Sequence, residues 1–303
     1  MKNIAVIGAG TMGNGIAHVF AQNGFDVHLF DISSQALERA VQTISKNLDR
    51  IISKGGLDEN QKQVILNRLK CSTELKVAVE KADLVVEAAT ERVDLKLNIF
   101  SDLSRLTRPG AILASNTSSI SITRIGAATN DPSRVIGMHF MNPVPVMKLV
   151  EIIRGYSTSE EVVQQIVELS RQLQKIPVEV GDFPGFISNR ILMTMINEAI
   201  ESLHEGVAGV KEIDAIMKLG MAHPMGPLQL ADFIGLDVCL AILRVLQEGF
   251  GNPKYAPCPL LVNMVTAGKL GVKTGEGFYR HDPGSKDVAV SAQFLSRSSK
   301  SFD

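Results

Sequence analysis

One histidine of the six, His139, stands where a proton-transfer group would be useful, directly after the short apolar run 135–138. Neutral imidazole titrates near physiological pH, so a histidine at the end of a buried strand can take a proton from an alcohol. Glu151 lies on the next apolar run and could orient the ring and stabilise the imidazolium. A lone histidine is also often a structural residue, and position alone leaves both interpretations open.

A glycine-rich string at the start of the chain matches the pattern G-x-G-x-x-G, with an apolar run before it and an amphipathic run after it. Gly8 permits a tight turn, Gly10 lets a pyrophosphate approach the backbone, and Gly13 lets a helix pack on a strand. The pyrophosphate would meet free N–H groups at the helix start. We therefore predict a dinucleotide site that includes Gly8, Gly10, Thr11, Met12 and Gly13.

An acidic residue, Asp31, ends the second apolar run, 23 residues after Gly8. A carboxylate at this spacing accepts hydrogen bonds from the adenine ribose and repels a 2′-phosphate. The sequence therefore favours NAD over NADP. Two polar clusters, 89–91 and 115–119, follow later apolar runs and would line the same cleft, although ordinary solvated loops look alike.

Apolar runs alternate with amphipathic ones through the first half of the chain, which is typical of a parallel α/β sheet. We expect strands at 4–8, 25–31, 84–88, 112–114, 135–139, 149–153 and 177–180. We expect helices at 11–24, 34–53, 59–69, 94–106 and 160–175. The predicted fold is α/β, with a Rossmann-type, doubly wound and mainly parallel sheet, followed by a smaller all-α domain.

The pattern changes near residue 183, so we predict a nucleotide-binding domain over 1–183 and an all-helical domain over 184–303. The predicted helix 186–204 is apolar on more than one face and needs burial all round. A partner subunit or the centre of its own domain would each supply that burial. The Ser- and Lys-rich stretch from about 285 is expected to be a loosely held tail.

Composition excludes several classes of function. The 303 residues are 45% hydrophobic and carry a net charge of −1, which favours neither a nucleic-acid nor a membrane partner. The cysteines, Cys71, Cys239 and Cys258, lack metal-ligand spacing and fit a reducing compartment. The apolar run near the N-terminus is too short for a signal peptide, so we expect a cytoplasmic protein without a metal site.

The string from His139 to Glu151, HFMNPVPVMKLVE, resembles the signature of the 3-hydroxyacyl-CoA dehydrogenase family. The resemblance extends in order over residues 1 to about 280. It also includes the strings 116–119, 184–190, 224–232 and 275–279.

The resemblance implies an NAD-dependent oxidation of the 3-hydroxyl of an acyl-CoA, by a homodimer joined through the helical domain. His139 would be the catalytic histidine and Glu151 its paired acid, while Ser118 and Asn189 would touch the reacting oxygen. A non-catalytic protein that keeps the NAD-binding fold for a structural role is the alternative. It is disfavoured because all four of these residues are present.

The resemblance also implies the residues that bind the cofactor and the CoA. Glu91 and Lys96 would contact the cofactor near its nicotinamide end, where Ser118 and Asn142 would assist, and Asn142 would also contact the substrate. Lys54 would meet the CoA phosphates, a task that Lys46 and Arg50 could share. A basic helix face is also often merely solvated, so a dehydrogenase of a free hydroxy acid stays open as an alternative.

Overall fold

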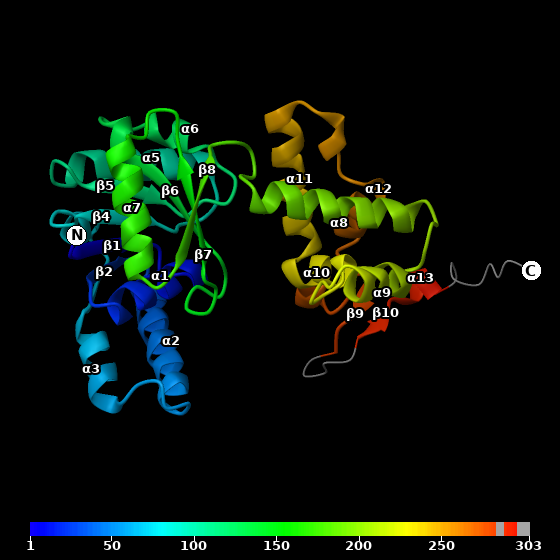
Figure 1. Cartoon of the computed structure of the whole chain (residues 1–303), viewed down its shortest axis with the longest axis horizontal. Helices are drawn as coiled ribbons and strands as arrows, with labels where there is room; N and C mark the ends of the chain where they lie inside the picture. Colours follow the sequence, from blue (N-terminus) through cyan, green and yellow to red (C-terminus); the bar gives the residue numbers. More distant parts are fainter. Residues whose placement is uncertain (283–287, 296–303) are drawn as a thin grey trace, which may run out of the picture. The chain divides into compact units, whose positions relative to one another are not determined.

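The computed structural model describes residues 1–282 and 288–295, and the chain folds into two compact units, Met1–Phe186 and Ile187–Asp303. Figure 1 shows strands and helices mixed in the first unit and mainly helices in the second. The doubly wound sheet followed by a helical unit confirms the predicted fold class.

The first unit contains an eight-stranded sheet in the order β3-β2-β1-β4-β5-β6-β7-β8. Neighbouring strands are parallel except β6 and β7, which are antiparallel. The strands are β1 Asn3–Ile7, β2 Asp26–Phe30, β3 Leu69–Ser72, β4 Leu84–Glu87, β5 Ile112–Ser115, β6 Val135–Phe140, β7 Leu149–Arg154 and β8 Ile176–Gly181.

The seven predicted strands are all present, and β3 is an addition that we did not expect. Its sequence, LKCS, has neither an apolar run nor a clear alternation, and its residues are half-buried or exposed. Pairing with β2 at the edge of the sheet supplies its backbone hydrogen bonds, so the strand forms without the apolar signal that predicts a buried one.

Helices cover both faces of this sheet (Figure 1). The helices are α1 Thr11–Gln22, α2 Ser34–Ile52, α3 Glu59–Asn67, α4 Leu75–Val79, α5 Val93–Leu106, α6 Ile122–Gly126 and α7 Glu160–Gln172. Successive residues of β1 point to opposite faces: Ile4 and Val6 join the core under α1, α2 and α7, whereas Ala5 and Ile7 join the core under α4, α5 and α6.

The second unit packs its helices around a separate core. Its elements are α8 Ser188–His204, α9 Val210–Gly220, α10 Pro227–Ile234, α11 Leu236–Phe250, α12 Pro259–Thr266, β9 Tyr279–Arg280, β10 Ala289–Val290 and α13 Ala292–Leu295. Two buried carboxylates tie these elements together. Asp232 accepts the N–H groups of Phe278 and Tyr279, and Asp214 accepts those of Leu228 and Gln229 at the start of α10.

The expectation of a loosely held tail is wrong for residues 288–295. There β10 pairs with β9, and the side chains of Val290 and Phe294 are buried in the core of the second unit. The Ser291 N–H donates to the Phe278 carbonyl at 3.0 Å. Burial of two apolar side chains outweighs the polar composition of the stretch. The remaining part of the predicted tail, 285–287 and 296–303, lies outside the described residues.

Candidate active site

The turn between β1 and α1 has the backbone that its glycines predict. Gly8 has a φ of +101°, and a Cβ there would lie 2.7 Å from the Ala88 carbonyl oxygen. A Cβ on Gly13 would lie 1.7 Å from the Gly8 carbonyl oxygen, so only glycine lets α1 start this close to β1. A Cβ on Gly10 would meet open space. The backbone at Gly10 is therefore accessible, as a pyrophosphate at the start of α1 requires.

The carboxylate of Asp31 is fixed beside this turn. Its Oδ2 accepts the Ala9 N–H at 2.8 Å, and its Oδ1 accepts the Ser33 N–H at 2.9 Å. A carboxylate has about four acceptor positions, so these two bonds leave capacity for ribose hydroxyls. Asp31, the turn and the accessible Gly10 together fit the adenosine and pyrophosphate of a dinucleotide.

His139 and Glu151 form a buried pair across β6 and β7. The two residues face each other in the antiparallel register, and His139 Nδ1 lies 2.8 Å from Glu151 Oε2. Their exposed fractions are only 9% and 3%. A carboxylate at Nδ1 favours the tautomer with the proton on Nδ1, which leaves the lone pair on Nε2 to accept a substrate proton. The pair can therefore act as an oriented general base.

Ser118 lies in the loop between β5 and α6, and this loop is attached to the strand that carries His139. The Asn116 side-chain oxygen accepts the N–H of Phe140, the residue after His139, at 2.9 Å. Asn142 is exposed in the loop that directly follows β6. Ser118, Asn142 and His139 thus lie at the carboxyl ends of two neighbouring parallel strands, where ligands of such sheets bind.

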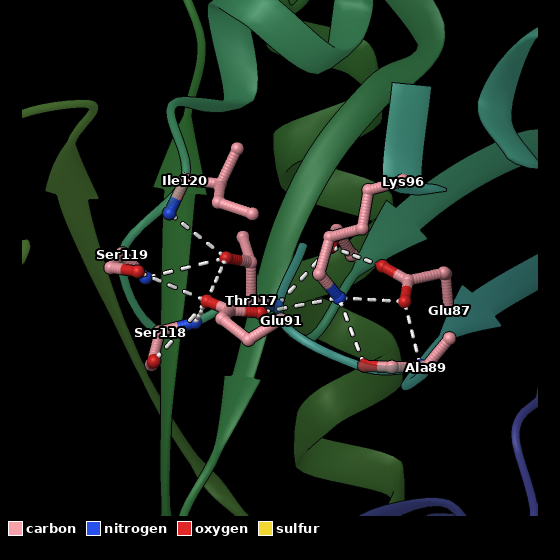
Figure 2. A network of polar contacts seen from close by, with 9 residues as sticks. Glu87, Ala89, Glu91, Lys96, Thr117, Ser118, Ser119 and Ile120 are labelled. Atoms are coloured by element: carbon pink, nitrogen blue, oxygen red, sulfur yellow. Dashed lines mark hydrogen bonds and ion pairs between the residues drawn. The ribbon is translucent and has the colours of Figure 1, made fainter. Parts of the chain in front are cut away.

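Glu91 holds the Ser118 loop, and Figure 2 shows it between that loop and Lys96. Its Oε1 accepts the Thr117 hydroxyl at 2.6 Å, the Ser118 N–H at 2.9 Å, and the Ser118 and Ser119 hydroxyls at 3.3 and 3.1 Å. Burial by itself raises the pKa of Glu91. The charge of Lys96 and the bonds from Thr117 and Ser118 outweigh that effect, so its pKa is lowered and the carboxylate stays ionised.

Lys96 is buried at the centre of this network, with 1% of its surface exposed. Its ammonium lies 2.7 Å from Glu87 Oε1, 3.2 Å from the Ala89 carbonyl oxygen and 3.3 Å from Glu91 Oε2. These three acceptors match the three donors of an ammonium. Lys96 therefore fixes Glu91 and the loop after β4, whereas the direct cofactor contact that we expected of it stays a prediction.

Glu87, the last residue of β4, belongs to this network although we did not predict it from the sequence. Its carboxylate is fully buried and accepts the Ala89 N–H and the Ser115 hydroxyl, each at 2.7 Å, besides the Lys96 ammonium (Figure 2). Glu87 thereby joins β4, β5 and α5. A lone acidic residue that ends an apolar run such as LVVE was the available signal, because an unpaired carboxylate would not be buried there.

The residues that we expected to contact the CoA and the substrate oxygen lie on helices. Lys46 and Arg50 are exposed on α2, and the exposed Lys54 follows its last turn at the same four-residue spacing, which places all three on one side of the helix. Asn189 is the second residue of α8, in the other unit. Its contact with the reacting oxygen stays a prediction.

Known proteins resemble this chain along most of its length. The sequence profile described as 3-hydroxyacyl-CoA dehydrogenase, NAD binding domain, matches residues 3–183, and the profile of the C-terminal domain of the same enzymes matches residues 185–281. A probable 3-hydroxybutyryl-CoA dehydrogenase of Bacillus subtilis is 53% identical over 282 residues, which are 93% of this chain and 98% of the relative.

Two solved structures superimpose closely on this chain. The crystal structure of the (S)-3-hydroxybutyryl-CoA dehydrogenase of Ralstonia eutropha superimposes with a TM-score of 0.90 at 49% identity and covers 93% of this chain and 99% of that one. A diketoreductase superimposes with a TM-score of 0.81 at 31% identity and covers the same shares. Along the described residues, we find no helix with the length and apolar character that crossing a bilayer requires.

Proposed function

The chain belongs to the 3-hydroxyacyl-CoA dehydrogenase family, and on that premise we propose that it interconverts (S)-3-hydroxybutyryl-CoA and acetoacetyl-CoA with NAD. It is an NAD-dependent oxidoreductase, because the profile that matches the first unit is that of the family's NAD-binding domain. The buried His139–Glu151 pair carries the proposal, since it supplies an oriented base at the carboxyl ends of the strands. The choice of the four-carbon substrate rests on the relatives of about 50% identity.

His139 performs the proton transfer of the reaction. NAD, when bound, would supply the acceptor for the hydride that leaves C3 of the substrate. His139 Nε2 takes the proton of the 3-hydroxyl as the carbonyl forms, and Glu151 stabilises the resulting imidazolium through Nδ1. In the reverse direction the imidazolium donates that proton to the carbonyl oxygen. The pairing matters because an uncompensated imidazolium is costly in a buried setting.

Ser118 and Asn189 bind the oxygen on which His139 acts. Ser118 is supported for this role by its loop, which Glu91 and Asn116 hold against the end of β6. The Ser118 hydroxyl donates to Glu91 over 3.3 Å and can rotate to donate instead to the substrate oxygen, whose own proton goes to His139. Asn142, exposed after β6, contributes to the same region. Glu91 borders the nicotinamide end of the cofactor from the loop after β4.

The CoA binds along the basic side of α2, and Lys54 is its main phosphate contact. Lys46 and Arg50 add charge on the same side, and an ammonium or guanidinium is a good partner for phosphate oxygens. The arm formed by α2 and α3 is braced by the ion pair between Lys62 and Asp49, at 2.5 Å. CoA binding energy then positions C3 for the reaction.

The second unit is proposed to join two copies of the chain into a homodimer in the cytoplasm. Val207, Ile216, Leu219 and Met221 are large apolar residues that the unit leaves exposed on or beside α9. A cavity of about 320 Å³ between α8 and α9 adds an apolar lining that includes Met195 and Ile213. Exposed apolar surface of this kind is typical of a subunit interface. Ile216→Glu should shift the sedimentation coefficient to that of a monomer if the proposal is right.

The activity is tested by following NADH oxidation with acetoacetyl-CoA, with free acetoacetate and with no acceptor. We expect turnover only with the thioester and its loss in His139→Gln. Turnover of the free keto acid alone would instead support a free hydroxy acid as the substrate. A series of 3-ketoacyl-CoA substrates of increasing chain length, compared by kcat/KM, tests the preference for four carbons.

A further inference from the structure

Phe186 has a backbone conformation that large side chains rarely adopt. Its φ is +50°, in the left-handed region, although it is neither glycine nor asparagine. Its side chain is almost completely buried. For a bulky residue such a conformation costs conformational energy and persists only where the surroundings enforce it. Strain of this kind gathers at functional sites, which directs attention to the neighbours of the Phe186 ring.

The segment before Phe186 is anchored firmly. The Asp182 carboxylate accepts the Ser121 hydroxyl at 2.7 Å and the Ile122 N–H at 3.0 Å, at the start of α6. The Phe186 N–H donates to the Phe183 carbonyl at 2.9 Å, which closes a tight turn through Gly185. The ring then enters the core cluster under α4, α5 and α6. Anchor, turn and burial together hold the unusual conformation.

The Phe186 ring packs against the imidazole of His139. The two ring centroids are 6.0 Å apart, and the ring planes are inclined by 57°. The bond between His139 Nδ1 and Glu151 fixes one atom of the imidazole but leaves the ring able to pivot about that bond. A second contact from an aromatic ring restricts this pivoting, because the aromatic pair has a preferred tilt and separation.

We infer that Phe186 is a positioning residue for the reaction, which keeps His139 Nε2 directed at the substrate hydroxyl while Glu151 holds Nδ1. The inference rests on the proposed function, since it assigns to Phe186 the orientation of the proposed base. The strained backbone follows from this role: the chain must turn sharply at residues 185 and 186 to deliver the ring to His139 from the end of the first unit.

Substitution of Phe186 should therefore slow catalysis more than it weakens binding. In Phe186→Ala we expect kcat with acetoacetyl-CoA and NADH to fall roughly 10- to 10²-fold, as a small misplacement of a reacting group does. The KM values and the Kd for NADH should stay within about twofold of wild type, because the Phe186 ring is buried and does not contact a bound ligand. The solvent deuterium isotope effect on kcat should rise, since proton transfer becomes slower.

Phe100→Leu is the matched control, because Phe100 is fully buried in the same core cluster on α5. It should lower the unfolding temperature and leave kcat and the isotope effect at wild-type values. Phe186→Gly separates the effect of losing the ring from the effect of backbone strain, because glycine adopts the left-handed conformation without strain. This variant should unfold at a higher temperature than Phe186→Ala and have the same lowered kcat.

Phe186→Leu keeps most of the side-chain volume and is the variant to measure if Phe186→Ala does not fold. It should show an intermediate kcat and a raised isotope effect. Wild-type kcat and isotope effect in whichever of these two variants folds would overturn the inference, as would an equal loss of kcat in Phe100→Leu. Failure of the wild-type protein to oxidise NADH with acetoacetyl-CoA would instead contradict the proposed function.

Discussion

His139 and Glu151 stand directly opposite each other on β6 and β7, the antiparallel neighbours in an otherwise parallel eight-stranded sheet. The antiparallel register aligns the two side chains on one face, and their 2.8 Å contact follows from that alignment. A parallel pair of strands at this position would need a long crossover, so these residues could not then be only 12 positions apart.

Removal of the charge on Glu151 should impair catalysis without preventing cofactor binding. Glu151→Gln can present its amide to Nδ1 and favour the wrong tautomer of His139, so we expect kcat to fall roughly 10²–10⁴-fold. In His139→Gln, kcat should fall by a similar factor. The double variant should have a kcat only slightly below that of either single variant. Steady-state kinetics and NADH fluorescence titration check this. Multiplying losses in the double variant would show that the two residues act independently.

Single substitutions in the buried pair of Glu87 and Lys96 should destabilise the protein more than substitution of both residues together. Lys96→Met leaves the buried Glu87 carboxylate without a cation, and Glu87→Gln leaves Lys96 with the more exposed carboxylate of Glu91 alone. We expect each variant to lose about 3–5 kcal/mol in the free energy of unfolding. The double variant should lose less than either single variant. Urea denaturation measures all three. Additive losses would contradict a coupled pair.

Asp31→Ser should reduce the preference for NADH over NADPH by roughly tenfold or more, because it removes the charge that repels a 2′-phosphate. The measurement is the ratio of kcat/KM values for the two cofactors. Asp26→Ser, at the opposite end of β2, is the matched control and should leave that ratio unchanged. Equal ratios in wild type and Asp31→Ser would remove Asp31 from cofactor discrimination.

Stability should fall with acidification because of His18. Burial, assisted by the nearby charge of Lys175, lowers its pKa from 6.5 to about 4. Among the described residues, neither of its ring nitrogens has a hydrogen-bond partner. The unfolded chain thus takes up a proton at a higher pH than the folded chain does. The contribution of neutral His18 to the free energy of unfolding is fully present above pH 6.5. It decreases by up to about 3 kcal/mol as the pH drops towards 4.

His18→Leu should remove this part of the pH dependence. Denaturant unfolding of wild type and variant between about pH 4 and pH 7.5 gives the difference directly, and the other titrating groups cancel in the comparison. Parallel pH profiles for the two proteins would show that the imidazole of His18 is not the source.

Lys54→Ala should raise the KM for acetoacetyl-CoA roughly tenfold and leave kcat nearly unchanged, since one charge-assisted bond to a phosphate is lost. The effect should shrink at high salt. Acetoacetyl-pantetheine, which lacks the nucleotide phosphates, provides the control substrate. An increase in its KM as large as that for the CoA ester would place Lys54 away from the phosphates.

The nucleotide-binding turn was predictable because its requirements are local. Gly8 needs a positive φ and Gly13 a close backbone approach, and both demands are visible in a six-residue pattern. The strands of the sheet were predictable for a similar reason, since buried parallel strands are continuous apolar runs. The short polar strand β3 lacks that signal and forms only because β2 offers a partner.

Residue types and their order along the chain made His139, Glu151 and Asp31 candidates, since each lies on or directly after an apolar run. The resemblance of the string from His139 to Glu151 to a known family then assigned the catalytic pair. Tertiary structure alone decided which groups are buried and what they contact. Lys96 and Glu87 are joined by α5 folding back over β4, and Phe186 reaches His139 through a strained turn. Such contacts depend on the packing of distant segments, because burial is a property of the assembled core and not of the local sequence.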